Sequence, residues 1–131
     1  MRYLIDSDWL IDATTGRPGA QRALSSLSID GLAVSILTVA ELYEGAFGTL
    51  DPSHTLAGMR EFLSDYAVLF ISDSIAERFA RERADLRRQG RLIPDMDLLI
   101  AATALTHDLT LLTRNVRHFA RIPGLRIYLT T

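Results

Sequence analysis

The 131-residue chain contains no cysteine and no lysine. The absence of cysteine excludes disulfides and thiolate metal sites, which fits a protein of a reducing compartment. All 14 basic residues are arginines, whose planar guanidinium groups suit phosphate. The absence of lysine argues against phosphate-processing enzymes that rely on a lysine to neutralise the phosphate.

Long apolar runs are also missing. No run reaches the roughly 18 residues that a membrane-spanning helix requires. The N-terminus has no basic leader followed by an apolar stretch, so the sequence predicts no signal peptide. We expect a cytoplasmic protein without membrane association, folded as a single domain over residues 1–131. Its 48% apolar and 23% charged residues are typical of a globular domain with a buried core.

The arginines are unevenly distributed. The net charge of −2 argues against a generic nucleic-acid binder. However, six arginines lie between residues 78 and 91, and three more lie between residues 114 and 121. Two interpretations of the first group remain open. It forms a phosphate-binding surface, or it belongs to a solvated helix face that Glu77, Glu82 and Asp85 neutralise.

Short β-prone runs alternate with helical patterns along the whole chain. The expected strands cover residues 2–6, 31–36, 66–71, 110–113 and 125–129. This alternation predicts an α/β fold, namely a three-layer α/β/α arrangement around a central, mostly parallel sheet with right-handed crossovers. The helix that begins near Asp95 is apolar nearly all round and should be buried.

Three helix starts carry recognisable signals. Thr38 and Glu41 have the spacing of a capping box, which predicts Thr38 as an N-cap. Asp51 and Pro52 predict another start, with aspartate as the N-cap and proline in the first position. Ser72 is expected to cap a long helix that follows it.

Polar side chains follow the strands or open the helices after them. Asp6 ends the first strand, and Glu41 follows the second. Asp95 and Asp97 begin the buried helix, and Asn115 follows the fourth strand. The carboxyl ends of parallel strands meet at one edge of a sheet, where ligands bind. We therefore expect these side chains to lie near one another.

Converging carboxylates repel one another and are costly to bury without a counter-charge. No arginine is interleaved with these acids, and lysine is absent. A hard divalent cation, Mg²⁺ or Mn²⁺, is the natural partner for such oxygen ligands. A site of this kind can activate water and stabilise charge on a phosphodiester.

Each acid also has a purely structural interpretation. Glu41 is explained equally by its place in the capping box. One of the two acids that open the buried helix complements the helix dipole. Asp8 and Asp12 fit helix caps or solvated side chains. Asp6 is the hardest to explain structurally, because an acid that ends a strand has no capping role for that strand.

Four motifs in the chain resemble those of PIN domains, specifically the VapC-type toxin ribonucleases. The first motif is LIDSDWLI at residues 4–11, and the second is SILTVAELYEG at residues 35–45. The third is IPDMDLLIAATA at residues 93–104, and the fourth is LTRNVRHF at residues 112–119. Any one of these motifs is weak evidence, but four in the family's order along nearly the whole chain form a strong signal.

The resemblance implies roles for particular residues. By position, Asp6, Glu41 and Asp97 match the acidic metal-site residues of the family. Asn115 stands where many relatives carry a fourth acid, so the resemblance leaves the number of metal ions open. The auxiliary positions beside the site are Ser7, Asp95 and Thr113.

The resemblance further implies a Mg²⁺-dependent endoribonuclease, with Mn²⁺ as a substitute. Water would attack the phosphodiester, which leaves a 3′-hydroxyl product. A cognate antitoxin that occupies the acidic groove and a toxin homodimer are also implied. The expected contacts to the RNA backbone are Arg78, Arg81, Arg87, Arg88, Arg114 and Arg117.

Two other functions are compatible with parts of the sequence. Asp6 and Asp8 form a D-x-D after a strand, as in haloacid-dehalogenase-type phosphatases, but the lysine of that chemistry is absent and the chain is short for the family. A non-catalytic PIN-like module that binds RNA or regulates is the second alternative. Asn115 favours that alternative, because an amide contributes no charge to a metal site.

Overall fold

The computed structural model describes residues 1–129. The strands β1 (Tyr3–Ile5), β2 (Leu32–Ser35), β3 (Ala67–Leu69) and β4 (Thr110–Leu112) form a parallel sheet in the order β3-β2-β1-β4. The helices are α1 (Ser7–Thr14), α2 (Pro18–Leu27), α3 (Ile36–Phe47), α4 (Pro52–Leu63), α5 (Asp73–Arg88), α6 (Asp95–Thr106) and α7 (Val116–Phe119), with a 3-10 turn η1 (Ser28–Asp30) before β2. Within the described residues, no helix has the length and apolar character needed to cross a membrane.

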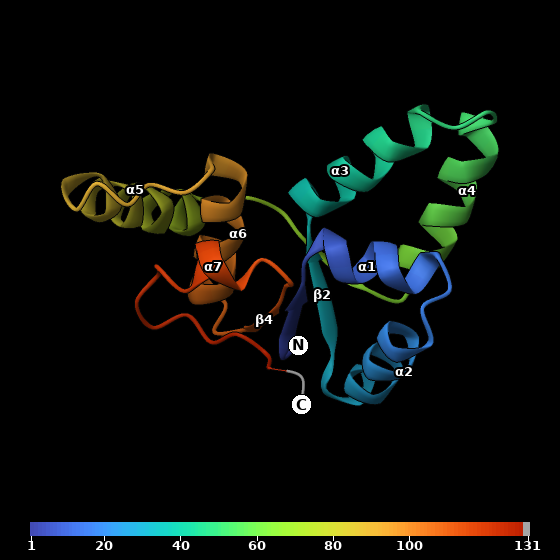
Figure 1. The fold of residues 1–131 in the computed structure, drawn as a ribbon, viewed down its shortest axis with the longest axis horizontal. Coiled ribbons are helices and arrows are strands. Elements are labelled where there is room, and N and C mark those ends of the chain that lie inside the picture. The colour runs from blue at the N-terminus through green and yellow to red at the C-terminus, as the bar shows by residue number, and fades with distance from the viewer. Residues whose placement is uncertain (130–131) are drawn as a thin grey trace.

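Two apolar cores lie on opposite faces of the sheet. Side chains alternate along a strand, so Tyr3 and Ile5 enter one core and Leu4 enters the other. The first core is completed by residues of α1 to α4, and the second by residues of α5 to α7. Figure 1 shows these two groups of helices on either side of the sheet. The three-layer α/β/α fold is therefore confirmed.

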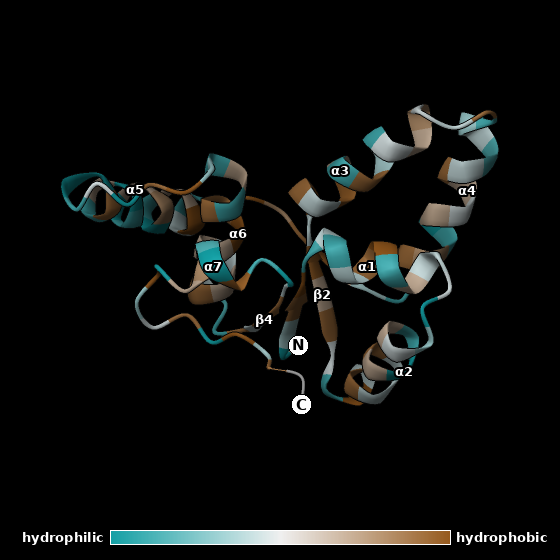
Figure 2. Ribbon diagram, viewed as in Figure 1, coloured by the Kyte–Doolittle hydropathy of each residue, from teal (hydrophilic) through white to brown (hydrophobic). Residues whose placement is uncertain are grey.

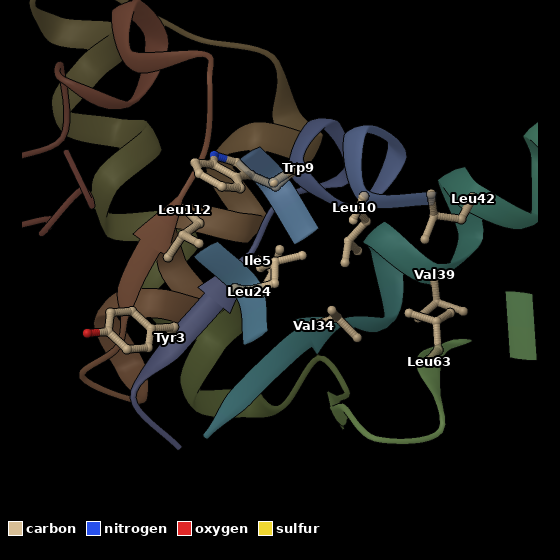
Figure 3. Close-up of a cluster of buried hydrophobic side chains, with 12 residues drawn as sticks. Tyr3, Ile5, Trp9, Leu10, Leu24, Val34, Val39, Leu42, Leu63 and Leu112 are labelled. Carbon is tan, nitrogen blue, oxygen red and sulfur yellow. The ribbon is translucent and has the colours of Figure 1, made fainter. Parts of the chain in front are cut away.

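The central strands are apolar on both faces because helices cover both. Figure 2 shows β2 as an apolar stretch, whereas α5 carries hydrophilic segments. Ile5, Leu10 and Val34 are fully buried and lie together in the first core (Figure 3). Burying each such side chain contributes about 1.5–3 kcal/mol. The buried side chains of the strands thus fix the sheet that positions the polar residues at its edge.

Most expected elements are present, with different boundaries. The strand expected at residues 66–71 covers only Ala67–Leu69. The predicted caps of α4 and α5 are confirmed. Asp51 Oδ1 accepts a hydrogen bond from the backbone N–H of His54, and Ser72 Oγ accepts one from that of Ile75, both at 3.2 Å.

The strand expected at residues 125–129 is wrong. Only a single bridge forms there, in which Leu111 bonds to the backbone of Arg126 and Tyr128 at 2.8 Å each. The reason lies in β4, whose other two residues, Thr110 and Leu112, bond inward to the β1 side. Only one residue of this three-residue strand directs its backbone N–H and C=O outward, so the strand cannot pair with a longer segment. The C-terminal segment still covers the outer edge of β4.

Candidate functional site

The direction of the chain across the sheet reverses between β1 and β4. From β1 the chain moves outward through β2 to β3, with α1 to α4 on one face, and it returns to β4 through α5 and α6 on the other. Such a switch point, at the carboxyl ends of the strands, is where parallel α/β sheets bind ligands. Asp6 follows β1 at this point, and Thr113 follows β4.

Asp6 is buried, with 8% of its surface exposed. Its Oδ1 accepts a hydrogen bond from the backbone N–H of Ser7 at 2.9 Å, so Asp6 is the N-cap of α1. Its Oδ2 accepts one from the Thr113 hydroxyl at 2.8 Å. Asp6 is therefore fixed by two strands and a helix, and its capping role serves the helix that follows it.

Burial raises the pKa of Asp6 from an ordinary 3.8 to about 6. The carboxylate of Asp8 adds to this rise, and Asp97 contributes a smaller one. The hydrogen bonds from Thr113 and Ser7 act in the opposite direction, because they favour the charged form. The hydrogen bonds therefore hold Asp6 at a position where its charged form is unfavourable.

Glu41 stands on α3 at the rim of the same edge. The predicted capping box is wrong, because Ser35 at the end of β2 caps the helix by accepting a hydrogen bond from Leu37 N at 3.1 Å. Helix α3 therefore begins at Ile36, and Glu41 lies beyond its first turn, where it has no capping role. Its pKa is raised by partial loss of hydration and then by nearby carboxylates, Asp6 first among them. The structural explanation of Glu41 is thereby removed.

Asp97 reaches the site from α6, on the opposite face of the sheet from α1. Its Oδ2 lies 2.9 Å from His118 Nδ1 and 3.4 Å from the side-chain amide nitrogen of Asn115. About a quarter of its side chain is exposed, 24% by surface. The charge of Asp97 raises the pKa of both Asp6 and Glu41, so the three carboxylates share one region.

Asp95, the other acid that opens α6, has a different environment. Its side chain is exposed and pairs with Arg83 of α5 at 3.1 Å. This pair connects the start of α6 to α5, in addition to any effect on the helix dipole. The two acids are two positions apart on the helix. Asp97 lies in the acidic region, whereas Asp95 forms a surface ion pair.

The second acid of the D-x-D, Asp8, belongs to a structural contact. Its Oδ1 accepts a hydrogen bond from Trp9 N at 2.7 Å, and its Oδ2 accepts one from Arg114 N at 2.8 Å. The guanidinium of Arg114 pairs with Asp12 at 2.8 Å and lies 4.3 Å from the Trp9 ring centroid. The cap expected at Asp8 is wrong, because Asp6 caps α1 and Asp8 lies in the first turn of that helix. Asp12 forms ion pairs with Arg17 and Arg114. Together, Asp8 and Asp12 attach α1 to the segment after β4.

Comparison with known proteins identifies the fold family. A model of the PIN domain family matches residues 3–125. The chain belongs to the PIN domain family. This PIN domain is similar to ribonuclease VapC2 of Haemophilus influenzae, with 33% identity over 126 residues that cover 96% of each chain.

Solved structures agree with this assignment. The PIN domain superposes on VapBC2 from Rickettsia felis, bound to a DNA fragment from their promoter, with a TM-score of 0.90 and 26% identity over 98% of each chain. It also matches a toxin–antitoxin complex from Klebsiella pneumoniae, with a TM-score of 0.77 and 35% identity over 94% of each chain. Both the fold class and the resemblance to VapC-type proteins are confirmed.

The donor set of this PIN domain suits a hard divalent cation. VapC-type nucleases are generally metal-dependent. Asp6, Glu41 and Asp97 offer carboxylate oxygens, which Mg²⁺ and Mn²⁺ prefer. Across residues 1–129, no three Asp, Glu or His side chains form a closed ligand cluster. Burial is the largest cause of the raised pKa of Asp6 and of Glu41, and nearby carboxylates add to both. A cation would offset this added repulsion.

One residue at this edge was not predicted as part of the site. His118 contacts both Asp97 and Asn115, at 2.9 and 2.8 Å. Its spacing of three residues from Asn115, within the fourth motif, is the signal that could have identified it, since such a spacing places two side chains on the same side of a helical turn. Ser7 contributes its backbone N–H to Asp6.

The six arginines expected to contact RNA fall into two groups. Arg78 pairs with Glu82 at 3.0 Å, Arg88 pairs with Asp85, and Arg114 is held by Asp12. For Arg78 and Arg88, these pairs agree with the second interpretation of the sequence, a helix face that acidic residues neutralise. Of these six arginines, Arg81, Arg87 and Arg117 have no ion pair within the described residues.

A cleft of about 650 Å³ lies away from the acidic edge. It is bounded by α2, by the end of α4 and by the starts of β2 and β3, with Leu24 and Phe62 among its apolar residues. Glu61 and Asp65 are its acidic residues. Because neither Asp6, Glu41 nor Asp97 lines this cleft, it is separate from the candidate metal site.

Proposed function

We propose that this PIN domain is a metal-dependent endoribonuclease of the VapC type, with Asp6, Glu41 and Asp97 as the residues that would hold Mg²⁺ or Mn²⁺. The single observation that carries the proposal is the convergence of these carboxylates from β1, α3 and α6 at the switch point of the sheet. The family match and the ribonuclease relative support the same reaction class.

A bound divalent cation supplies an activated water and offsets charge on the phosphate oxygens. The chain's own residues orient the ligands for it. Thr113 and the N–H of Ser7 fix both oxygens of Asp6. Glu41 has the freedom of an exposed side chain at the rim of the site. Attack by water, rather than by the 2′-hydroxyl of the RNA, would leave a 3′-hydroxyl end.

The remaining site residues have supporting roles in this proposal. Asn115 is part of the catalytic set by position, and it adds a polar group without a charge. Ser7 and Thr113 are auxiliary through Asp6, and Asp95 is auxiliary through its pair with Arg83, which holds the start of α6. A full PIN-like domain over residues 1–131 is the unit that we expect to be active.

The RNA backbone would lie across arginines near the acidic edge and along α5. Arg81, Arg87 and Arg117 are the better candidates, because a phosphate would not have to displace an existing ion pair. Arg78, Arg88 and Arg114 would each have to leave a carboxylate partner or share it. Phosphate contacts of this kind weaken with salt, so RNA binding should fall as the ionic strength rises.

We also propose a cognate antitoxin, a toxin homodimer and a cytoplasmic location. The structural match to a toxin–antitoxin complex supports the antitoxin. Co-expression with the product of the adjacent open reading frame tests this part directly. A small protein that co-purifies and suppresses RNA cleavage is the expected result, and cleavage that is unchanged by that product would contradict it.

The reaction is tested by cleavage of total bacterial RNA in Mg²⁺. The substitutions Asp6→Asn and Asp97→Asn keep the side-chain shape but remove a charged metal ligand. Loss of a supporting contact to a ligand already costs about 10–100-fold, so each substitution should lower the rate by at least that factor. Undiminished cleavage by both variants would overturn the proposal. Calorimetric titration with MnCl₂ separates it from a non-catalytic module, which would bind no metal at millimolar concentration.

A further inference from the structure

A continuous series of hydrogen bonds connects Asp6 to Asp97. The Thr113 hydroxyl donates to Asp6 Oδ2 at 2.8 Å, and its oxygen accepts from the backbone N–H of Asn115 at 3.0 Å. The Asn115 amide and His118 Nδ1 then lie 3.4 and 2.9 Å from Asp97 Oδ2. An acid at the end of the sheet and an acid on a helix are therefore connected by residues of one short segment after β4.

The positions of the protons in this network follow from its geometry. An ionised carboxylate only accepts hydrogen bonds, so the 2.9 Å contact with Asp97 places a proton on His118 Nδ1. With that proton in place, Nδ1 cannot also accept a hydrogen bond from the Asn115 amide at 2.8 Å. The imidazole N–H gains a second acceptor when Asn115 turns its amide oxygen towards it, since the two ends of an amide are interchangeable in shape. The 3.4 Å contact between Asn115 and Asp97 is then not a hydrogen bond. Asn115 then accepts from His118 as Asp97 does.

The helix that carries His118 is firmly anchored. Helix α7 has only four residues, but the next residue, Phe119, is fully buried in the second core. The backbone N–H of Arg114 is held by Asp8, and that of Asn115 is held by Thr113. The imidazole of His118 is itself about one-third exposed, 33% by surface. Its position is thus set by the core on one side and by the segment 113–115 on the other.

We propose that His118 is a positioning residue for Asp97, and that Asn115 orients His118. This inference rests on the proposed metal-dependent function. The imidazole N–H fixes one oxygen of Asp97 and leaves the other available as a ligand. A protonated Nδ1 cannot itself bind a cation, so the nitrogen that contacts Asp97 acts through that carboxylate. Asn115 is an acceptor for the imidazole and so helps to fix its orientation.

The experiment compares His118→Leu with His118→Asn in the full chain. Leucine removes the donor, whereas asparagine can place an amide N–H near the position of Nδ1. His54→Asn is the matched control, because His54 is an exposed histidine on α4. Calorimetric titration with MnCl₂ is the first readout. A lost contact to a ligating carboxylate weakens metal affinity by about 10–100-fold, so His118→Leu should show this loss, and His118→Asn should recover most of it.

Two further readouts separate positioning from general damage to the fold. The thermal midpoint of metal-free His118→Leu should stay within a few degrees of the unsubstituted protein, as expected for a partly exposed side chain. Cleavage of total bacterial RNA by His118→Leu should be slow at low Mg²⁺ and should recover as the Mg²⁺ concentration is raised. Such recovery is expected when a ligand is misplaced but still present.

The outcomes distinguish this inference from the function on which it rests. Manganese binding by His118→Leu equal to that of the unsubstituted protein would overturn the role of His118 and leave the proposed function intact. Equal losses in His118→Leu and His118→Asn would also overturn it, because the donor would then not be the relevant group. A folded, unsubstituted protein that binds no Mn²⁺ would overturn the proposed function itself.

Discussion

Asp6 and Asp97 meet at one edge of the sheet but are held by different kinds of structure. Asp6 ends a central strand, is almost fully buried, and has its oxygens bonded to a backbone N–H and a hydroxyl. Asp97 lies in the first turn of a helix, is partly exposed, and is bonded to the His118 imidazole, which Asn115 contacts in turn. One acid is positioned by the sheet and the other by side chains.

The difference has consequences for stability and for function. Burial makes Asp6 costly when it is charged, and the fold bears that cost because β1 is fixed between β2 and β4. Asp97 is supported by groups that can be removed without opening the core. We therefore expect substitutions near Asp6 to change the free energy of unfolding, and substitutions near Asp97 to change metal affinity and rate.

The largest expected effect on stability is that of Asp6→Asn. The folded state binds the Asp6 proton more tightly than the unfolded state, so the free energy of unfolding falls as the pH rises from 3.8 to about 6. A rise of roughly two pKa units corresponds to about 3 kcal/mol. Metal-free Asp6→Asn should therefore be more stable than the unsubstituted protein above pH 6, by up to that amount, while it loses RNA cleavage.

Urea unfolding in a chelator at pH 4, 5, 6 and 7 measures this difference. The advantage of Asp6→Asn should be small at pH 4 and greatest from pH 6 upward. The new amide oxygen can still accept from the Ser7 N–H, and its nitrogen can donate to the Thr113 oxygen. The Thr113 O–H then loses its acceptor, which reduces the gain. A stability difference that stayed constant from pH 4 to 7 would contradict the raised pKa of Asp6.

The next effect is expected for Thr113→Val, which keeps the shape but removes the hydroxyl. That hydroxyl is buried and bonds both Asp6 Oδ2 and the backbone N–H of Asn115. Leaving buried polar groups without partners costs about 1–3 kcal/mol, and we expect a loss of stability in that range.

Thr38→Val provides a matched control for this loss. The Thr38 hydroxyl is also fully buried, but among the described residues it has no hydrogen-bond partner. Its removal should leave the free energy of unfolding unchanged or raise it. If Thr38→Val were as destabilising as Thr113→Val, the cost would come from the shape of the side chain and not from the bonds to Asp6.

A smaller effect is expected for Arg114→Ala. The guanidinium lies over the Trp9 ring and pairs with Asp12, which attaches the segment after β4 to α1. An exposed cation–π contact and a surface ion pair each contribute up to about 1 kcal/mol, so the loss should be about 1 kcal/mol in urea unfolding. Arg81→Ala on the exposed face of α5 is the comparison, and it should stay within about 0.5 kcal/mol. Equal values for both would contradict the structural role of Arg114.

The sequence predicted the position of Asp6, which the sheet holds, better than the support of Asp97, which other side chains hold. The place of Asp6 followed from a short apolar strand and the rule that parallel strands end at one edge. The caps at Asp51 and Ser72 were equally local and are confirmed. The capping box at Thr38 is not formed, because Ser35, at the end of β2, caps the helix three residues earlier.

The support of Asp97 could not be predicted in the same way. Residues 97 and 118 are far apart along the chain and meet only because α6 and α7 pack on the same face of the sheet. The bridge at Leu111 likewise depends on which residues of β4 face outward, and this follows from the pairing with β1. Local patterns specify strand ends and caps, whereas contacts between elements require the register of the sheet.

The smallest expected effect on stability is that of Glu41→Gln. It tests whether an exposed acid of the site affects metal affinity without affecting stability. Glu41 is exposed, and no contact depends on its charge in the described residues, so the free energy of unfolding should change by no more than about 0.5 kcal/mol. The sign should be stabilising above the ordinary pKa of glutamate, because partial burial and then nearby carboxylates raise the pKa of Glu41. Manganese affinity should nevertheless fall clearly, since a ligand is lost. Calorimetry and urea unfolding on the same preparation check both. A large loss of stability with unchanged Mn²⁺ binding would show that Glu41 supports the fold and not the metal site.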